Sequence, residues 1–111
     1  MTNRFNFANN IIYKDGECFL SFLSNIQTIL VLDKYIVILV KYSTGNNQNI
    51  YCYDLQKNRK WQIPKPVALH SENYFSALYL RDSEIYAYNI NGVEYHLDKD
   101  TGNILGTELI K

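Results

Sequence analysis

The sequence predicts an all-β fold, a single domain over residues 1–111 in which an antiparallel meander of about ten strands forms a β-sandwich or a barrel. Three observations predict it. Short apolar or alternating segments recur along the chain between turn residues, and no window shows the periodicity of an amphipathic helix. Ten Tyr and twelve Ile favour strands, whereas thirteen Asn favour turns. A length of 111 residues with 47% hydrophobic side chains suits one globular core.

The N-terminal third predicts four strands. Asn10–Lys14 and Glu17–Leu23 flank Asp15-Gly16, a pair that favours a two-residue hairpin turn. Ile26–Leu32 and Tyr35–Tyr42 follow, and both are almost continuously apolar. Such segments are typical of strands buried on both faces, so we expect these two to be central.

The middle of the chain predicts a loop and a hairpin. Residues 43–48 are polar, as is typical of a loop. Asn49–Leu55 and Lys60–Ile63 form the expected hairpin around residues 56–59. Two prolines, at positions 64 and 66, end the second strand because proline has no backbone N–H for the ladder.

The C-terminal third predicts four further strands after Val67–Asn73, a segment that we expect to be a short helical turn or a linker. Dipeptides rich in Asp, Asn and Gly separate these strands. Each connection is too short for a crossover helix, so all neighbours are expected to be antiparallel. The four strands are Tyr74–Leu80, Glu84–Ile90, Val93–Asp98 and Asn103–Leu109.

A weak internal repeat relates residues 26–63 to residues 74–109, because each half contains four successive predicted strands. Tyr53–Trp61 can be aligned on Leu97–Leu105. Both stretches resemble the hairpins of quinoprotein-type β-propeller blades, in which a strand ending in Leu-Asp leads through Thr-Gly into an aromatic or apolar strand. A period of about 40–50 residues fits a four-stranded blade. Two blades cannot close a propeller, so a single sandwich or barrel is favoured over a ring of several chains.

Charge is balanced overall but not along the chain. Eleven basic side chains offset eleven acidic ones, which disfavours a general nucleic-acid binder. Residues 1–65 carry eight basic and four acidic groups, whereas residues 66–111 carry three basic and seven acidic groups. We therefore expect a molecule with a basic end and an acidic end.

No set of residues indicates an enzyme, a metal site or a cofactor. Glu94, His96 and Asp98 alternate along one strand and should share a face, but neighbours on a strand face lie about 6.6 Å apart, usually too far to bind one ion. A solvated polar face is the expected role of these three side chains. The sequence also lacks a Gly-x-Ser-x-Gly elbow and a phosphate-binding glycine loop. An active site that joins His70 to His96 is the disfavoured alternative.

Several features favour a cytoplasmic protein. The N-terminal residues lack the apolar segment of a secretory signal, and the longest apolar run, Tyr35–Val40, is far too short to cross a membrane. Cys18 and Cys52 lie in apolar segments, where we expect free buried thiols rather than a disulfide.

One hairpin of the sequence is basic and carries the single tryptophan. The basic side chains Lys57, Arg59, Lys60 and Lys65 surround Trp61. Such a cluster suits either an anion or nucleic-acid contact or a solvated tip that protects a sheet edge.

Tyrosines offer the other binding feature of the sequence. Tyr51 and Tyr53 share one strand face, and Tyr86 and Tyr88 share another. Tyrosine suits interfaces because it adds contact area and a hydroxyl at small entropic cost. The alternative is packing over the edge of the core.

A small β-rich chain with polarised charge and many Asn, Ile, Lys and Tyr residues is similar to the immunity proteins of bacterial polymorphic toxin systems, including contact-dependent growth inhibition. The resemblance implies a non-enzymatic protein that neutralises a cognate toxin, most often a nuclease, whose basic face would meet the acidic C-terminal half. The alternatives are a β-barrel carrier of a small ligand and a propeller-like oligomeric scaffold. The candidate partner contacts are Glu84, Tyr86, Tyr88, Glu94, His96 and Asp98.

Overall fold

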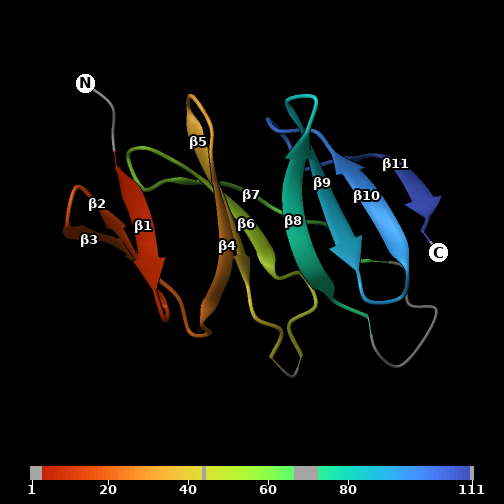
Figure 1. Ribbon diagram of the computed structural model, residues 1–111, viewed down its shortest axis with the longest axis horizontal. Coiled ribbons are helices and arrows are strands. Elements are labelled where there is room, and N and C mark those ends of the chain that lie inside the picture. The colour runs from red at the N-terminus through yellow and green to blue at the C-terminus, as the bar shows by residue number, and fades with distance from the viewer. Residues whose placement is uncertain (1–3, 44, 67–72, 111) are drawn as a thin grey trace.

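The protein is all-β and antiparallel, as the sequence predicts. The computed structural model describes residues 4–43, 45–66 and 73–110. These residues contain eleven strands, against about ten expected from turn spacing (Figure 1). The strands are β1 (Phe5–Ala8), β2 (Ile11–Lys14), β3 (Glu17–Ser21), β4 (Ile26–Val31), β5 (Tyr35–Val40), β6 (Ile50–Asp54), β7 (Arg59–Gln62), β8 (Phe75–Arg81), β9 (Glu84–Asn89), β10 (Val93–Leu97) and β11 (Ile104–Leu109).

The strands form three sheets that follow one another along the longest axis of the molecule (Figure 1). The first sheet contains β1–β3, the middle sheet β4–β7 and the last sheet β8–β11. Each sheet is a meander in which every strand pairs with its neighbour in sequence. The result is a layered arrangement of the sandwich type in which each sheet keeps two edge strands.

The middle sheet is covered on both faces. From β5, Val37 and Leu39 belong to a core shared with the last sheet, while Ile36, Ile38 and Val40 belong to a core shared with the first sheet. All five side chains are almost completely buried, because a strand alternates its side chains between two faces. The sequence therefore predicted the central position of β5 correctly.

The prediction for the preceding strand was wrong. Residues 26–31 form β4, which is equally apolar in sequence but lies at the edge of the middle sheet and leaves Val31 exposed. An edge strand can be apolar when other elements lie beside it, and β4 contacts β1 and β8. Strand β1 was not predicted, because its four residues have only two apolar aromatic side chains, Phe5 and Phe7. Residues 67–72, where a helical turn or linker was expected, lie outside the described residues.

The predicted two-residue turns are present. Asp15 and Gly16 both have positive φ, 52° and 85°, and join β2 to β3. Asp82 and Ser83 have φ values of 53° and 64° and join β8 to β9. Positive φ at both central residues gives the tight turn whose twist matches that of the strands. The second turn fixes which residues of β8 and β9 lie opposite each other.

The internal repeat corresponds to the middle and last sheets. Asp54 and Asp98 occupy equivalent strand ends, and each carboxylate accepts two backbone N–H bonds in the following turn. The turn residue with positive φ is Lys57 in one sheet and Gly102 in the other. These two residues are 45 positions apart whereas the aspartates are 44 apart, so the second turn is one residue longer.

Candidate functional site

The last sheet has one buried and one outward face. Ile85, Ala87 and Leu97 point into the core shared with the middle sheet. The alternate positions of the same strands point outward, and the register places Tyr86 of β9 between Tyr79 of β8 and His96 of β10. This outward face of β8–β11 is the candidate site.

Three flat rings form a row across this face. The ring centroids of Tyr79 and Tyr86 are 6.3 Å apart with an interplanar angle of 13°. Those of Tyr86 and His96 are 4.7 Å apart at 12°. Cross-strand neighbours have Cβ atoms close enough for such contacts. We call Tyr79, Tyr86 and His96 the ring row.

A buried carboxylate is held beside the ring row. Glu94 is only 6% exposed, and its carboxylate accepts two bonds from the Arg81 guanidinium, at 3.1 and 3.2 Å, and one from the Tyr79 hydroxyl. Arg81 also lies over the Tyr86 ring, 4.0 Å from its centroid. The guanidinium thus combines stacking with a two-point contact to a carboxylate.

These contacts shift the ionisation of the groups involved. The hydrogen bonds from Arg81 and then Tyr79 lower the pKa of Glu94, despite the opposing effect of burial. Burial and the hydrogen bond to Glu94 raise the pKa of Tyr79 to about 12. Glu94 is therefore a carboxylate, and Tyr79 a phenol that donates to it, at neutral pH.

The other acidic residue near the ring row is accessible. Glu84 Oε1 lies 2.8 Å from His96 Nε2, and their side chains are 52% and 29% exposed. In contrast to Glu94, Glu84 can exchange its contact for one with a partner.

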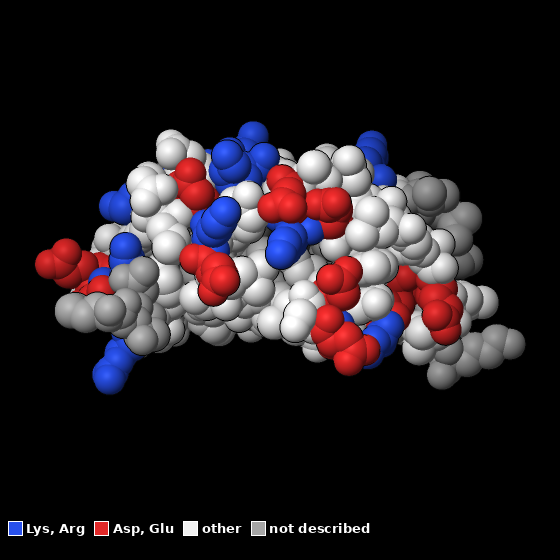
Figure 2. All heavy atoms as spheres, turned by 90° about the horizontal axis from the view of Figure 1, so that it is seen from above, with Lys and Arg blue, Asp and Glu red and all other residues white. Residues whose placement is uncertain are grey.

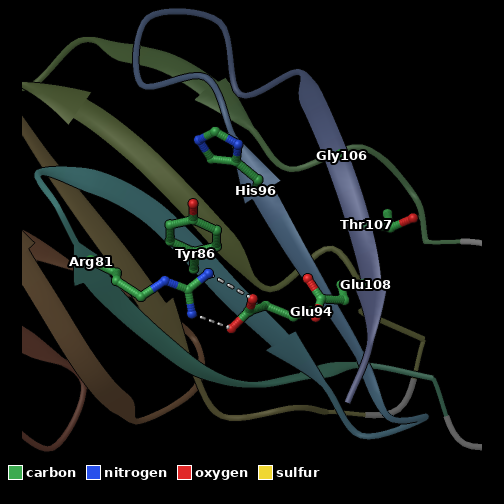
Figure 3. A pocket seen from close by; sticks show the side chains of 7 residues that line it. All are labelled: Arg81, Tyr86, Glu94, His96, Gly106, Thr107 and Glu108. Carbon is green, nitrogen blue, oxygen red and sulfur yellow. Dashed lines mark hydrogen bonds and ion pairs between the residues drawn. The ribbon is translucent and has the colours of Figure 1, made fainter.

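A shallow pocket of about 210 Å³ lies where the ring row meets the edge strand β11. Gly106 lies opposite His96 in the ladder, and Glu108 lies opposite Glu94. A Cβ atom built on Gly106 would have no heavy atom within 4 Å, so the space beside the imidazole is open. The side chains from four strands that line this pocket are drawn in Figure 3: Arg81, Tyr86, Glu94, His96, Thr107 and Glu108, with Gly106 labelled beside them.

The structure brings five of the six sequence-predicted contact residues to this face. Glu84 and His96 are accessible, and Tyr86 and Tyr88 are half-buried. Glu94 lies on the face but is buried, so the expectation of a solvated polar row was wrong for this residue. A glutamate can be buried here because Arg81 supplies the opposite charge.

Asp98 does not join the other five. Its Oδ1 atom accepts bonds from the backbone N–H groups of Asp100 and Thr101, at 2.8 and 3.2 Å. The carboxylate thus caps the turn between β10 and β11 rather than extending the face of Glu94 and His96. Strand alternation ends where the turn begins, which is why the spacing rule failed at this position.

Sequence reasoning missed four residues of the site: Tyr79, Arg81, Gly106 and Glu108. A signal for the first two was present, because the tight turn at Asp82-Ser83 pairs Tyr79 with Tyr86 and Arg81 with Glu84. The other two had none, because a bulge between β10 and β11 shifts their register.

The other candidate binding features have structural roles. Trp61 is 7% exposed, and its indole N–H donates to the carbonyl of Lys99 at 2.8 Å, so it is not available for nucleic-acid stacking. Tyr51 and Tyr53 pack against Phe22, with centroid distances of 5.5 and 6.0 Å.

The two cysteines are free thiols, as expected from the sequence. Cys52 is buried, and burial raises its pKa to about 12. Cys18 is exposed in β3, so its predicted burial was wrong.

Two searches of the structure found nothing. Over residues 4–43, 45–66 and 73–110, no three His, Cys, Asp or Glu side chains are grouped so that they could hold a metal ion. The same part of the chain has no helix with the length and apolar character needed to cross a membrane.

Charge is distributed unevenly over the surface. Figure 2 shows Asp and Glu side chains gathered toward the half of the molecule that contains the last sheet, on the face seen from above. In the same view, Lys and Arg side chains are more frequent over the other half. The polarity expected from the sequence is therefore visible on this face.

Comparison with known proteins identifies a family and a similar fold. A family model described as "Domain of unknown function (DUF7957)" matches residues 2–109. No curated protein matches the chain. A crystal structure of the computationally designed Ika8 protein is similar over 96% of this chain, with a TM-score of 0.62 and 14% sequence identity. The chain spans about a third of that design, covering 36% of it, so the likeness concerns the layered fold alone.

Proposed function

The chain belongs to the DUF7957 family, and we propose that it is a non-enzymatic binding protein whose outward face of β8–β11 recognises a basic protein partner. One observation carries this proposal. The ring row, the buried Arg81–Glu94 pair and the accessible Glu84 form an ordered polar surface over a packed sheet. Interface centres are typically enriched in tyrosine and arginine held in fixed positions.

Acidic side chains at the rim of this face define the partner's charge. Glu84 and Glu108 are both exposed, and Glu108 has no hydrogen bond or ion pair within the described residues. Facing carboxylates of this kind favour a positively charged surface and accelerate its approach. The partner we propose is the cognate toxin of a bacterial polymorphic toxin system, a basic nuclease domain, which this protein would neutralise as an immunity protein in the cytoplasm.

The experiment measures binding to the product of the adjacent upstream gene. Binding should be tight at low salt and weaken as the salt concentration rises, because the contacts are ionic at the rim. The variant Glu84→Lys/Glu108→Lys should weaken binding by at least about tenfold, since each reversal replaces attraction with repulsion. Glu94 and Asp98 are not suitable for this test because their carboxylates support the fold.

A matched control carries the same change of charge elsewhere. Glu17 lies in β3 of the first sheet and Asp33 in the turn after β4, and both are exposed. The variant Glu17→Lys/Asp33→Lys should bind as the parent does, apart from a small loss of long-range attraction. Equal binding by both double variants would show that the partner uses another surface.

A propeller-like oligomeric scaffold is the second candidate function. The middle sheet is covered on both faces, whereas the last sheet has a single neighbour, and the designed protein with a similar fold is about three times as long. Several copies stacked end to end would cover these faces. Sedimentation that shows a monomer at high concentration would remove this candidate.

The carrier alternative has less support. The space between the sheets is filled by the side chains of the two cores. The surface pockets described for this structure measure about 130 to 270 Å³, below the range of about 300–1,000 Å³ that is usual for small-molecule sites.

A further inference from the structure

The pocket beside Gly106 is shaped for one particular kind of side chain. The ring row places one flat ring on each of β8, β9 and β10. The next position in the row belongs to β11, where the residue opposite His96 is Gly106. Glycine has no side chain, and the space where its Cβ would point is open to 4 Å. The row is therefore vacant at its fourth position.

The imidazole has one face available on that side. Tyr86 stacks on His96 from the direction of β9, at 4.7 Å. Gly106 flanks His96 from the direction of β11, and both residues line the pocket. A flat group that enters the pocket would therefore meet the ring of His96.

A carboxylate stands beside the vacant position. Glu108 lies two residues along the same strand and lines the same pocket. It lies directly opposite Glu94, and like charges at such positions repel each other. Arg81 neutralises Glu94, whereas Glu108 has no counter-charge within the described residues.

The molecule already contains the complementary arrangement one position away. There, Arg81 lies over the Tyr86 ring at 4.0 Å and binds the Glu94 carboxylate at 3.1 and 3.2 Å. His96 and Glu108 repeat the ring and the carboxylate without the arginine. Arginine is suited to this because its planar guanidinium stacks on rings and forks onto carboxylates.

We infer that the pocket between His96, Gly106 and Glu108 binds an arginine side chain of the partner protein, with the guanidinium stacked on the imidazole and bound to the Glu108 carboxylate. This inference rests on the proposed function in that it names the side chain by which a basic partner would be recognised. Lysine fits less well, because an ammonium group cannot stack as a plane.

The test uses blocked amino acids and so does not require the partner. N-acetyl-arginine amide is titrated into the intact protein while NMR records the Gly106 amide and the His96 ring. Both signals should shift and saturate with millimolar affinity, whereas N-acetyl-citrulline amide, of the same shape but uncharged, and N-acetyl-lysine amide should bind at least about fivefold more weakly. Equal effects of all three compounds, or no shift at either residue, would overturn the inference.

Two variants localise the binding. Gly106→Tyr should fill the vacant position and abolish the arginine-dependent shift at His96, whereas Gly106→Ala leaves most of the space and should keep it. Glu108→Gln should weaken arginine binding about fivefold without affecting the fold, because the side chain is exposed. Arginine binding that survives both Gly106→Tyr and Glu108→Gln would contradict the assignment, and the second variant decides if the first does not fold.

Failure of this inference is separable from failure of the proposed function. If blocked arginine does not bind but the partner binds in a manner sensitive to Glu84→Lys/Glu108→Lys, the face is correct and the arginine pocket is wrong. If blocked arginine binds but no basic partner depends on this face, the pocket is correct and the proposed function is wrong.

Discussion

Gly102 lies directly against the indole ring of Trp61, and so joins the last turn of the chain to the middle sheet. A Cβ atom on Gly102 would lie 2.4 Å from Cε3 of Trp61, and the residue has a φ of +74°. The indole N–H donates to the carbonyl of Lys99 in the same turn. Only glycine meets both the backbone and the packing requirement at this position.

Gly102→Ala is expected to destabilise the protein by about 2–4 kcal/mol, since it adds a clash with a buried ring to the cost of positive φ. Gly16→Ala is the matched control, because Gly16 also has positive φ, +85°, but has nothing within 4 Å of its Cβ position. That variant should lose about 1–2 kcal/mol. Chemical denaturation measures both, and equal losses would mean that the Trp61 contact adds no strain.

Asn49 is a buried link between the middle and last sheets. Its amide donates to the carbonyls of Val40 and Phe75, at 2.9 and 2.8 Å, and accepts from the N–H of Phe75. Asn49→Leu has a similar size but leaves these backbone groups unpaired, so a loss of about 2–4 kcal/mol is expected.

Gln27→Leu is the matched control for Asn49. Gln27 also links β4 to β8, through a bond of 2.8 Å to the carbonyl of Ser76, but it is exposed. Water can replace an exposed bond, so the loss should be below about 1 kcal/mol. If the two leucine variants unfold at the same denaturant concentration, the buried amide is not a main link between the sheets.

Acid should destabilise the protein through Glu94. The pKa of Glu94 is lowered from its ordinary value of 4.5 in the folded state, so the unfolded chain binds more protons at acidic pH. The stability that this carboxylate contributes is present at neutral pH and is lost as the pH falls from about 4.5 through the lowered folded value. Urea denaturation at neutral and acidic pH should therefore show a smaller acid-induced loss for Glu94→Gln than for the parent.

Glu17→Gln provides the reference for that comparison, since Glu17 is an exposed carboxylate of β3. Its acid-induced loss should match that of the parent. A parent and a Glu94→Gln variant that lose stability in parallel would show that the Arg81–Glu94 pair does not contribute to the pH dependence.

The two thiols should react at very different rates. Burial raises the pKa of Cys52 to about 12, so near pH 8 it is almost entirely protonated as well as inaccessible. Cys18 is exposed. A thiol reagent should modify one cysteine per chain in the folded protein and two in denaturing guanidinium chloride, and Cys18→Ser should leave no fast-reacting thiol. Rapid modification of both thiols in the folded state would contradict the burial of Cys52.

Local patterns in the sequence were sufficient to predict most of the strands and turns. Asp15-Gly16 and Asp82-Ser83 act through the backbone conformation of two residues, and alternation along β9 and β10 predicted which side chains of Tyr86, Ala87 and His96 share a face. Such properties depend on near neighbours, which the sequence displays directly.

The environment of each side chain was beyond sequence reasoning. Glu94 and Glu84 are both outward glutamates in the sequence pattern, but one is buried under Arg81 and the other is exposed. The difference arises because Tyr79 and Arg81 of β8 extend over Glu94, two strands away, and no pattern within β10 records that contact.

By itself, the sequence determined the all-β class, the order of the strands and the polarity of charge, because propensity, alternation and turn chemistry are properties of short segments. Only the tertiary structure decided that the strands divide into three stacked sheets, that β4 is an edge strand although it is as apolar as β5, and that Gly106 leaves a space beside His96. These features depend on register and on packing between residues distant in the chain, where a bulge of one residue changes which side chains meet.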